Sequence, residues 1–429
     1  MWKEIKTTLD ICWIFLTEYF IHFFSQNSNS FLQILAIKLS EKNILYVKLF
    51  QMFASHYKYI DSDSKQNIFF NFTNNAPYKE KDVDYNALWS VLDKNKLNID
   101  KLRIINSGMI SLVYRYEGEK VFKIKRKNIE QDLKEAITHF RFIINLFSYI
   151  PCFFSLLSSL SFLFEQNIKI IEQQINFETE VENLIQFQET CFKEKMDYVQ
   201  IPTVYRDNNL HLKNKKVIVM EYLEGIPFEK LSEEERKLFA EYVVRFGLDS
   251  LLKLELIHGD LHAGNILFLK KKDEQNTNTT TTQYKLGVID FGIVYRMDPA
   301  FKEQGMNLGF NFFFLKQSSR EIAKQLLEIV LIKTEYWEEK EFLMDNISEM
   351  LDNFLEGKEN ILFKIMGLLE KLANLFHPHY LEKHGFILHP DFYHLQLAMA
   401  MTHGITLELC GEQNYIELVE QVWNKYYQL

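Results

Sequence analysis

Hydrophobic and polar positions along the first 96 residues recur at helical spacing. The period is clearest from Phe31 to Ala54, where apolar residues return as they do on the buried face of an amphipathic helix. A polar stretch from Asp61 to Asp84 follows and is typical of a linker. We therefore expect residues 1–96 to form a helical extension ahead of the rest of the fold.

The pattern changes to that of strands after this extension. Residues from Ile104 to Tyr116 alternate loosely between apolar and polar, a Glu-Gly-Glu turn follows at 117–119, and Val121 to Lys125 is typical of a returning strand. Val217 to Tyr222 is another short apolar strand. These segments predict a small antiparallel sheet.

The remainder of the chain is mostly helical in pattern. Helical spacing runs from Asn128 to Phe192, an amphipathic helix is expected from Glu233 to Leu256, and everything after Asp298 is typical of helix. The Asn/Thr-rich stretch from Lys270 to Thr282 indicates a solvated loop between two strands. We expect an α+β chain with three parts: the extension at 1–96, a sheet-bearing domain at 97–222 with a helical insertion at about 130–172, and a helical domain at 223–429.

Composition limits the possible functions. Hydrophobic residues make up 47% and aromatic residues 15% of the chain, enough for a large core, which excludes wholesale disorder. The formal net charge is -9 and no concentrated run of Lys and Arg is present, so we expect no nucleic-acid partner. The four cysteines are scattered without a C-x-x-C pair, which argues against a disulfide framework and fits an intracellular, reducing compartment.

One long uncharged segment, from Phe142 to Phe164, raises the question of a membrane. Its length is close to the roughly 20 residues that span a hydrocarbon core, but Pro151 and several serines interrupt it. Two packed helices broken near Pro151 are the favoured interpretation, and peripheral membrane contact through this segment is the alternative. No signal or transit peptide is evident, since Leu9 to Phe24 predicts a buried or interfacial helix.

Candidate chemistry is concentrated in two short motifs. Residues 258–265 fit H-x-D-x-x-x-x-N, and an apolar strand ends in D-F-G at 290–292. Protein-kinase-like folds use this combination to hold Mg²⁺ and ATP. Phosphoryl transfer needs one carboxylate to take or orient the acceptor's proton, an amide to help hold a metal ion, and a second carboxylate for the metals that bridge the phosphates. Asp260, Asn265 and Asp290 fit these roles in that order.

Such a site also needs a strand lysine that contacts the phosphates and a glutamate that holds this lysine. Lys123 supplies the amine, although Lys125 points to the same face under the period-two alternation of a strand. The candidate glutamates Glu178, Glu180 and Glu182 lie farther along the chain than in an ordinary protein kinase. Any one of the three could instead belong to a solvated helix face.

Several segments together resemble the atypical kinase family called ABC1, UbiB or AarF-like, of which this chain looks like a divergent member. These segments are N-F-E-T-E-V-E-N at 176–183, V-M-E-Y-L-E-G-I-P at 219–227, the loop at 258–265 with its second histidine, His262, which corresponds to the family's catalytic loop, and D-F-G-I-V-Y-R-M-D-P at 290–299. The resemblance covers roughly Ile44 to Asp298. It implies a bilobal protein-kinase-like fold, with a small antiparallel-sheet N-lobe and a mainly helical C-lobe, that binds ATP and Mg²⁺.

The resemblance also implies roles for single residues. Glu180 would pair with Lys123, the nucleotide loop would be 106–111, and adenine would meet the main chain of 220–222. The nucleotide-binding residues expected in this way are Lys123, Ser107, Gly108, Met220, Glu221 and Tyr222. Known members act in ubiquinone biosynthesis or lipid homeostasis at membranes, so a membrane lipid or an isoprenoid- or quinone-like ligand is an expected partner.

Two departures from the family pattern concern its N-terminal lid. The family's K-x-G-Q motif is Lys48-Leu49-Phe50-Gln51 here, with a bulky ring in place of the glycine. The family's E-x-D is Gln174-Ile175-Asn176, which removes two acids. Because a lysine at position 48 would lose its charged partners, we expect the lid to be repacked or less tightly held.

The sequence thus predicts Mg²⁺-dependent ATP binding with either ATP hydrolysis or phosphoryl transfer to a small-molecule or lipid-linked acceptor, in quinone or lipid homeostasis. An ATP-gated lipid-binding or scaffolding pseudokinase is the alternative. It is favoured by the uncharged segment and by the nucleotide loop, which is N-S-G-M-I-S at 106–111 where the family has an alanine-rich loop. A small-molecule kinase of the aminoglycoside or choline type fits less well, because of the long insertion before Glu180.

Overall fold

The fold was analysed in a computed structural model of the chain, which divides into two compact units. The first unit comprises residues 1–182 and 203–222, and the second comprises 183–202 and 223–429. The structure describes residues 2–24, 34, 37–39, 41–43, 45–46, 76, 78–95, 97–118, 120–148, 168, 171–205, 215–273, 281–313, 317–333, 337–356, 375 and 386–427. The Lys48–Gln51 motif and most of the uncharged segment, from 149 onward, lie outside these residues.

The first unit is built on a four-stranded antiparallel sheet with the strand order β1-β2-β3-β5. The strands are β1 (Leu102–Ser107), β2 (Ser111–Tyr116), β3 (Lys120–Lys125) and β5 (Val217–Glu221). The predicted run from Ile104 to Tyr116 is thus two strands, joined by a short hairpin loop at 108–110. The turn after β2 places Glu117 and Gly118 in the left-handed region, at φ 43° and 93°, as a tight hairpin requires.

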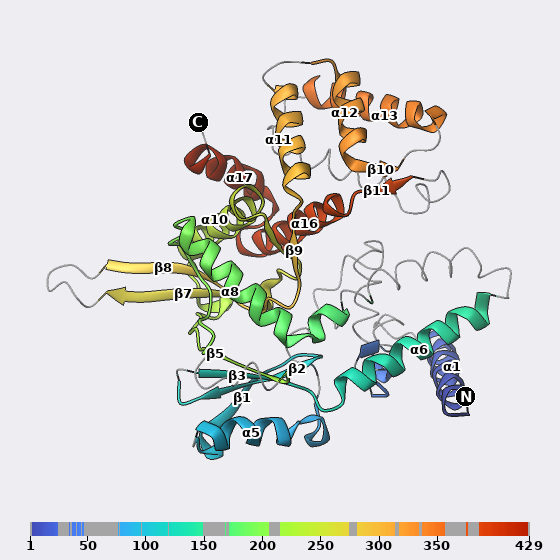
Figure 1. The fold of residues 1–429 in the computed structure, drawn as a ribbon, viewed down its shortest axis with the longest axis vertical. Helices are drawn as coiled ribbons and strands as arrows, with labels where there is room; N and C mark the ends of the chain where they lie inside the picture. Colours follow the sequence, from blue (N-terminus) through green and yellow to red (C-terminus); the bar gives the residue numbers. More distant parts are fainter. Residues whose placement is uncertain are drawn as a thin grey trace. The chain divides into compact units, whose positions relative to one another are not determined.

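Helix α5 (Tyr85–Asn95) lies along one face of this sheet (Figure 1). Its apolar side packs on the inward-facing strand residues, in a core cluster that includes Leu92, Leu112, Phe122 and Val219. The opposite face of the sheet carries Lys123 and is therefore free of α5, because successive side chains of a strand point to opposite faces.

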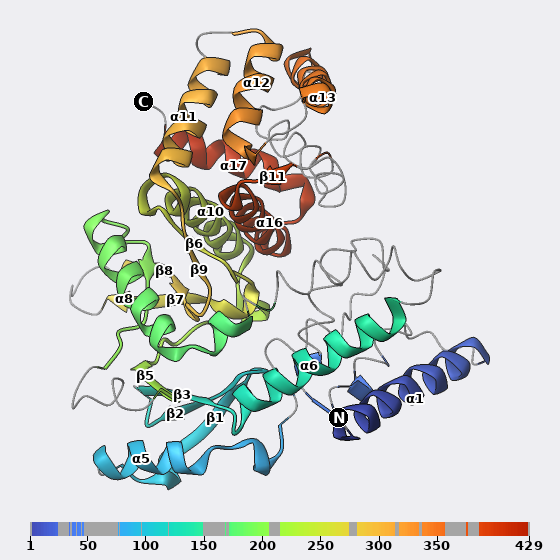
Figure 2. The same ribbon diagram turned by 45° about the vertical axis from the view of Figure 1, so that its right-hand side comes forward.

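Two further helices of the first unit, α1 (Trp2–Phe24) and α6 (Ile129–Ser148), lie side by side in both ribbon views (Figures 1 and 2). Leu45, Ile137 and Ile171 belong to the buried cluster between these segments, and Ile11 and Ile14 of α1 pack against it. None of the helices within the described residues has the length and the apolar character needed to cross a membrane.

Helix α8 (Phe177–Lys193) belongs to the first unit up to Glu182 and to the second from Asn183. The second unit contains a three-stranded sheet of β4 (Val199–Gln200), β8 (Thr281–Val288) and β7 (Ile266–Asp273), in that order. It also contains a two-stranded antiparallel pair, β6 (Leu256–His258) with β9 (Val294–Arg296). Both predicted motifs follow strands of these sheets. β6 leads into the catalytic loop, and β8 leads into D-F-G.

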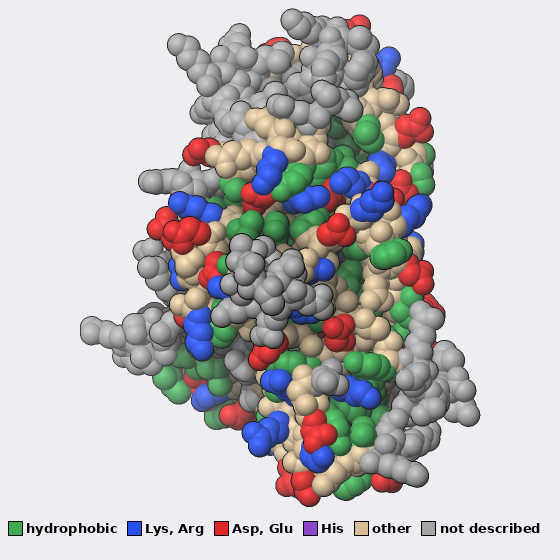
Figure 3. Space-filling view, turned by 90° about the vertical axis from the view of Figure 1, so that its left-hand side faces the viewer, with side chains coloured by type: hydrophobic (Ala, Val, Ile, Leu, Met, Phe, Trp, Pro, Cys, Tyr) green, Lys and Arg blue, Asp and Glu red, His purple; other side chains and the backbone are tan. Residues whose placement is uncertain are grey.

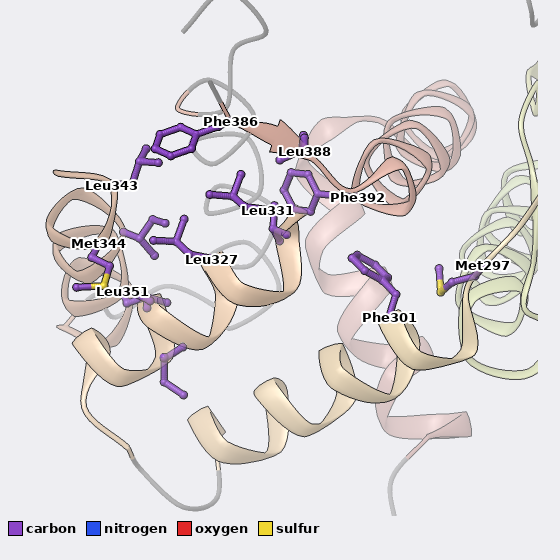
Figure 4. Packing of buried hydrophobic residues seen from close by; sticks show 14 of the residues in the cluster. Met297, Phe301, Leu327, Leu331, Leu343, Met344, Leu351, Phe386, Leu388 and Phe392 are labelled. Atoms are coloured by element: carbon purple, nitrogen blue, oxygen red, sulfur yellow. The ribbon is translucent and has the colours of Figure 1, made fainter. Parts of the chain in front are cut away.

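The rest of the second unit is mainly helical, as predicted. The helices are α10 (Glu233–Asp249), α11 (Pro299–Phe313), α12 (Ser319–Val330), α13 (Trp337–Glu356), α16 (Pro390–Cys410) and α17 (Glu412–Tyr426). Helix α10 begins with a capping box, in which Ser232 accepts from the Glu235 amide while the Glu235 carboxylate accepts from the Ser232 amide. Leu327 and Leu331, together with Leu343, Phe386 and Phe392, form the centre of a buried cluster (Figure 4).

Two sequence predictions for this unit were wrong in detail. The helix expected to reach Leu256 ends at Asp249, and one π-helical turn (Ser250–Leu254) follows before Glu255, at φ 55°, stops it. The region after Asp298 also contains two short paired strands, β10 (Leu331–Lys333) and β11 (Ile387–Leu388). Leu331 and Leu388 are buried, while Ile332 and Ile387 are exposed. This alternation is too short to be distinguished from a helical period in the sequence.

Charges of both signs are interspersed over the face drawn in Figure 3, where the coloured residues form no broad basic patch.

Candidate functional site

The first unit brings Lys123 and Glu180 together. The Lys123 ammonium lies 2.6 Å from a Glu180 carboxylate oxygen, and the two side chains are only 8% and 2% exposed. Lys123 stands on β3 and Glu180 on the first turn of α8, so a strand and a helix far apart in the sequence supply the pair. Burial at this depth is rare for lysine and glutamate unless each neutralises the other.

The structure separates these two residues from their sequence neighbours. Lys125 is also buried, but its ammonium contacts the mostly exposed Glu130 at 2.9 Å. Glu178 pairs at the surface with Lys215, 3.1 Å away, and Glu182 is exposed. Lys123 and Glu180 are therefore the members of the two candidate sets that meet in the interior.

Asn176 caps the start of α8. Its side-chain oxygen accepts hydrogen bonds from the Glu178 and Thr179 amides at 3.1 and 3.4 Å, at the start of α8. Its carbonyl accepts from the Glu180 amide at 3.1 Å. An asparagine suits this capping position as well as the aspartate of the family pattern, so this departure leaves the start of α8 intact.

The predicted nucleotide loop is tied down by internal hydrogen bonds. The Gly108 amide donates to the Ser111 carbonyl at 2.9 Å, and the Ser107 hydroxyl donates to the Ala76 carbonyl at 2.7 Å. The Arg126 guanidinium donates to the Gly108 carbonyl at 3.0 Å and to the Ser107 hydroxyl at 3.1 Å. Both predicted phosphate-facing residues are thus engaged within the unit.

The predicted adenine-facing segment lies at the end of β5. Met220 is buried opposite Val121, whereas Glu221 and Tyr222 are half-buried. The Glu221 amide donates to the Thr203 carbonyl at 2.8 Å, and the Arg115 guanidinium lies 3.8 Å above the Tyr222 ring. The segment is therefore fixed in place on the sheet edge.

The catalytic loop of the second unit is fixed by its main chain. The Gly259 amide donates to the Ile293 carbonyl at 2.9 Å, next to the β6–β9 pairing. A side chain at position 259 would meet Ile293 and Tyr295 at 2.5 Å, so only glycine allows the loop to lie this close to β9.

Asp260 and Asn265 are joined across this loop. The Asn265 side-chain amide donates to the Asp260 carbonyl at 2.8 Å, and the Asn265 carbonyl accepts from the Ile289 amide at 2.9 Å. The second bond places Asn265 beside the residue that precedes Asp290. The three predicted residues Asp260, Asn265 and Asp290 therefore belong to one hydrogen-bonded neighbourhood.

His258 is buried beneath this loop and is held in a defined tautomer. Its Nδ1 accepts from the Asp260 amide at 3.2 Å, so the proton of the neutral ring is on Nε2. Burial lowers the pKa of His258, and the nearby carboxylates of Asp260 and Asp290 offset this only in part. The ring is therefore neutral near pH 7 and acts as a spacer that orients the loop.

Asp290 adopts a left-handed backbone conformation, with φ 64°. Aspartate tolerates this region better than most residues, and here its carboxylate accepts from the Gly292 amide at 3.2 Å. Phe291 is fully buried against Phe187, with ring centroids 5.0 Å apart, and its carbonyl accepts from the Asn183 amide at 3.0 Å. Asn183 is a site residue that the sequence analysis missed, although its spacing of one helical turn from Glu180 was visible.

The donor chemistry at Asn265 and Asp290 fits Mg²⁺. Because the Asn265 amide nitrogen is used by Asp260, its oxygen is the atom left for a ligand, and Asp290 supplies a carboxylate. Mg²⁺ prefers oxygen ligands and is typically held by one or two side chains together with substrate phosphates. The described residues contain no cluster of three or more His, Cys, Asp or Glu side chains that could hold a metal alone.

The comparison with protein families identifies the chain. The ABC1 atypical kinase-like domain matches residues 111–326, just over half of the 429 residues. The protein belongs to this family. The match begins at β2 and ends in α12, so it includes Lys123, Glu180 and both motifs of the second unit. Together with the antiparallel sheet and the helical second unit, it confirms the predicted α+β, protein-kinase-like fold class.

A curated ABC1-family relative is an uncharacterized aarF domain-containing protein kinase of Arabidopsis thaliana, described as chloroplastic. It is 27% identical over 189 residues, which is 42% of this chain and 31% of the relative. The match thus spans about a third of that relative's length.

Among solved structures, the chain is similar to the Mycobacterium tuberculosis protein Rv3197 in complex with erythromycin, at 15% identity and a TM-score of 0.44, covering 80% of this chain and 83% of that one. It is also similar to the Rio2 kinase–ADP/Mg²⁺–phosphoaspartate complex of Chaetomium thermophilum, at 14% identity and a TM-score of 0.27, covering 68% and 76%. Since both TM-scores lie below 0.5, these likenesses do not by themselves establish the fold.

Proposed function

We propose that this ABC1-family protein binds Mg²⁺ and ATP and carries out ATP hydrolysis or phosphoryl transfer to a small-molecule or lipid-linked acceptor, in quinone or lipid homeostasis. The observation that carries the proposal is the buried ion pair between Lys123 and Glu180. A buried lysine whose ammonium is held at a fixed point by a carboxylate is what a nucleotide site needs to contact phosphates without reorganisation.

The roles of the other residues follow from their positions. In the first unit, Ser107 and Gly108 would line the phosphate-facing loop, and the main chain of Met220, Glu221 and Tyr222 would meet adenine. In the second unit, Asn265 and Asp290 would hold Mg²⁺, which when bound neutralises phosphate charge. Asp260 would accept or orient the acceptor's proton, and its carbonyl bond to Asn265 keeps these two residues in register.

Calorimetric titration of the purified full chain with ATP, in Mg²⁺ or in EDTA, tests the proposal. We expect binding that requires Mg²⁺ and that is lost in Asp290→Asn, because the variant replaces the charged metal ligand with a neutral one. Asp345→Asn is the matched control, since Asp345 is an exposed carboxylate that pairs with Arg320. Wild-type affinity in Asp290→Asn would show that the site has been assigned wrongly.

A second candidate function, an ATP-gated lipid-binding protein without phosphoryl transfer, is favoured by a separate observation on α1. The large apolar side chains Leu9, Trp13, Leu16, Phe20 and Ile21 are 50–69% exposed and recur at helical spacing. The acids Asp10 and Glu18 of the same helix contact Lys42 and Lys38, at 3.2 and 2.5 Å. A helix face with exposed Trp, Phe and Leu side chains suits the interface of a lipid bilayer.

Flotation with phosphatidylcholine vesicles, with and without Mg-ATP, tests the second candidate. We expect the wild type to float and Leu16→Glu to remain at the bottom of the gradient, because a charge in the middle of the apolar face opposes insertion. Phe192→Glu is the control, as Phe192 is an exposed aromatic residue at 87% on α8. If wild type and Leu16→Glu behave alike, or if nucleotide has no effect on flotation, the ATP-gated lipid function is excluded.

A further inference from the structure

Arg126 is a buried cation in the first unit that belongs to none of the kinase motifs. It follows β3 directly and is 5% exposed. The Asp82 carboxylate is 3.5 Å away and partly exposed, and burial lowers the pKa of the guanidinium. A buried guanidinium needs hydrogen-bond acceptors for its N–H groups, and several of these acceptors lie within the described residues.

Those acceptors lie on the predicted nucleotide loop. Arg126 donates from its main-chain amide to the Ile110 carbonyl at 2.9 Å and from Nε to the Gly108 carbonyl at 3.0 Å. Its Nη2 donates to the Ser107 hydroxyl at 3.1 Å. Arg126 thus contacts the segment 107–110 at three points, one through its main chain and two through its guanidinium, whose rigid planar fork fixes the relative positions of Ser107 and Gly108.

The same guanidinium also contacts the segment ahead of α5. Nη2 lies 3.4 Å from the Ala76 carbonyl, which in turn accepts from the Ser107 hydroxyl at 2.7 Å. The Ala76 amide donates back to the Ser107 carbonyl at 2.7 Å, so Ala76 and Ser107 are joined by one main-chain bond and one bond from the serine side chain. Arg126, Ala76 and Ser107 consequently form one hydrogen-bonded cluster at the start of the loop.

We propose that Arg126 is a positioning residue that fixes the nucleotide loop 106–111 in place for the phosphates. The purpose of this restraint rests on the proposed ATP-binding function, whereas the hydrogen bonds that produce it do not. Nucleotide loops of kinases are commonly mobile glycine-rich hairpins, and ordering one of them on binding costs affinity. Here the loop has a single glycine. The Arg126 guanidinium restrains the loop before any nucleotide binds and also places a positive charge next to it.

The surroundings of Gly108 support the proposal that hydrogen bonds, and not the glycine, fix the shape of the loop. A methyl group at position 108 would make only ordinary contact, at 3.4 Å from the Ser111 carbonyl, and Gly108 is not among the residues with positive φ. The shape of the loop therefore does not require glycine. What holds the loop is the set of hydrogen bonds to Arg126 and Ala76.

Amide hydrogen exchange across residues 104–112, measured by mass spectrometry on the full chain, tests the restraint without relying on activity. In Arg126→Gln we expect exchange of the loop to be about tenfold faster or more, since two or three buried hydrogen bonds are lost, while exchange of α10 is unchanged. Arg126→Lys keeps the charge but not the fork, and we expect an intermediate rate. Arg103→Gln, which removes an exposed arginine from β1 of the same sheet, is the matched control.

The results separate this inference from the proposed function. Unchanged loop exchange in both Arg126 variants would overturn the positioning role, whether or not ATP binds. Faster exchange would support it, and ATP titration of the same samples should then show weaker binding in Arg126→Gln than in Arg126→Lys. Faster exchange combined with no ATP binding by the wild type would leave Arg126 as the residue that orders the loop and would remove the nucleotide function. Should Arg126→Gln fail to fold, Arg126→Lys and Ser107→Ala carry the test.

Discussion

The side-chain amide of Asn183 donates a 3.0 Å hydrogen bond to the main-chain carbonyl of Phe291, 108 residues away in the chain. Both groups are buried, and the Phe291 ring is fully enclosed beside Phe187 and His258. This bond therefore fixes the main chain immediately after Asp290. It shows how a residue outside the recognised motifs can set the direction of a carboxylate within one of them.

Replacing Asn183 with Ala should destabilise the second unit. The Phe291 carbonyl would lose its buried donor, at a cost of about 1–3 kcal/mol. The substitution also removes the Asn183 side-chain oxygen, which is buried without a hydrogen-bond partner in the described structure, and this offsets part of the free-energy cost. Urea unfolding measures the difference. Asn346→Ala is the control, since its amide makes a comparable 2.8 Å bond to the Phe342 carbonyl at the surface and should cost under about 0.5 kcal/mol.

Two glycines with opposite surroundings give a second prediction. Gly259→Ala would place a methyl group 2.5 Å from Ile293 and Tyr295, so we expect a loss of about 1–3 kcal/mol or more in unfolding free energy. Gly305→Ala, on exposed α11 with nothing within 4 Å, should instead gain about 0.5–1 kcal/mol from its helix propensity.

Thermal unfolding of the two glycine variants beside the wild type decides this prediction. If Gly259→Ala were as stable as the wild type, the close approach of the catalytic loop to β9 would be wrong.

The catalytic loop could be predicted from the sequence because its chemistry and its local spacing coincide. Asp260, Asn265 and the residue before Asp290 lie in one hydrogen-bonded neighbourhood, and the H-x-D-x-x-x-x-N spacing already specified the first two. Strand β5 was also located to within a residue, because its apolar run is short and bounded by turn residues.

Choices between neighbouring residues of the same type could not be made from the sequence. Lys123 and Lys125 share a face of β3, and only the position of α8 decides which ammonium meets Glu180. The function of Arg126 depends on a main-chain carbonyl at Gly108, which has no side-chain signature at all. The short strands β10 and β11 were missed because their three and two residues are too few to establish a period.

Asp249 provides a third prediction, at the junction of α10 and the π-helical turn that leads to the catalytic loop. It is fully buried, and its carboxylate contacts the Lys253 ammonium at 2.7 Å, the Tyr427 hydroxyl at 2.7 Å and the Tyr198 hydroxyl at 2.8 Å. Asp249→Ala would leave Lys253 and both hydroxyls without this acceptor, so we expect a loss of about 3–5 kcal/mol.

Tyr427→Phe should remove only one hydrogen bond of this group and cost about 1 kcal/mol. The two losses are measured by urea unfolding monitored in the far-ultraviolet. Equal stability of Tyr427→Phe and the wild type would show that the end of α17 is not anchored through this hydroxyl.

The last prediction concerns acid, and it follows from His258 and His394. Burial lowers the pKa of both rings, with Asp260 and Asp290 offsetting it in part for His258 and Asp391 for His394. A histidine whose pKa is lower in the folded state than the ordinary 6.5 binds fewer protons there than in the unfolded chain. The stability it contributes is therefore complete above pH 6.5 and is lost as the pH falls through that value toward the folded pKa.

We expect the unfolding temperature to fall steadily from pH 7 to pH 5.5 and the slope to be shallower in His394→Gln. His394 stacks on Tyr295 with ring centroids 3.7 Å apart and its Nδ1 lies 3.1 Å from the Asp391 carboxylate, so His394→Gln should also lower the unfolding temperature at pH 7.5, where the difference reports these lost contacts and not titration. Comparing the slopes of unfolding temperature against pH, and not the temperatures themselves, separates the effect of histidine titration from the effect of lost packing. A slope in His394→Gln as steep as that of the wild type would assign the acid sensitivity to His258 or to groups elsewhere.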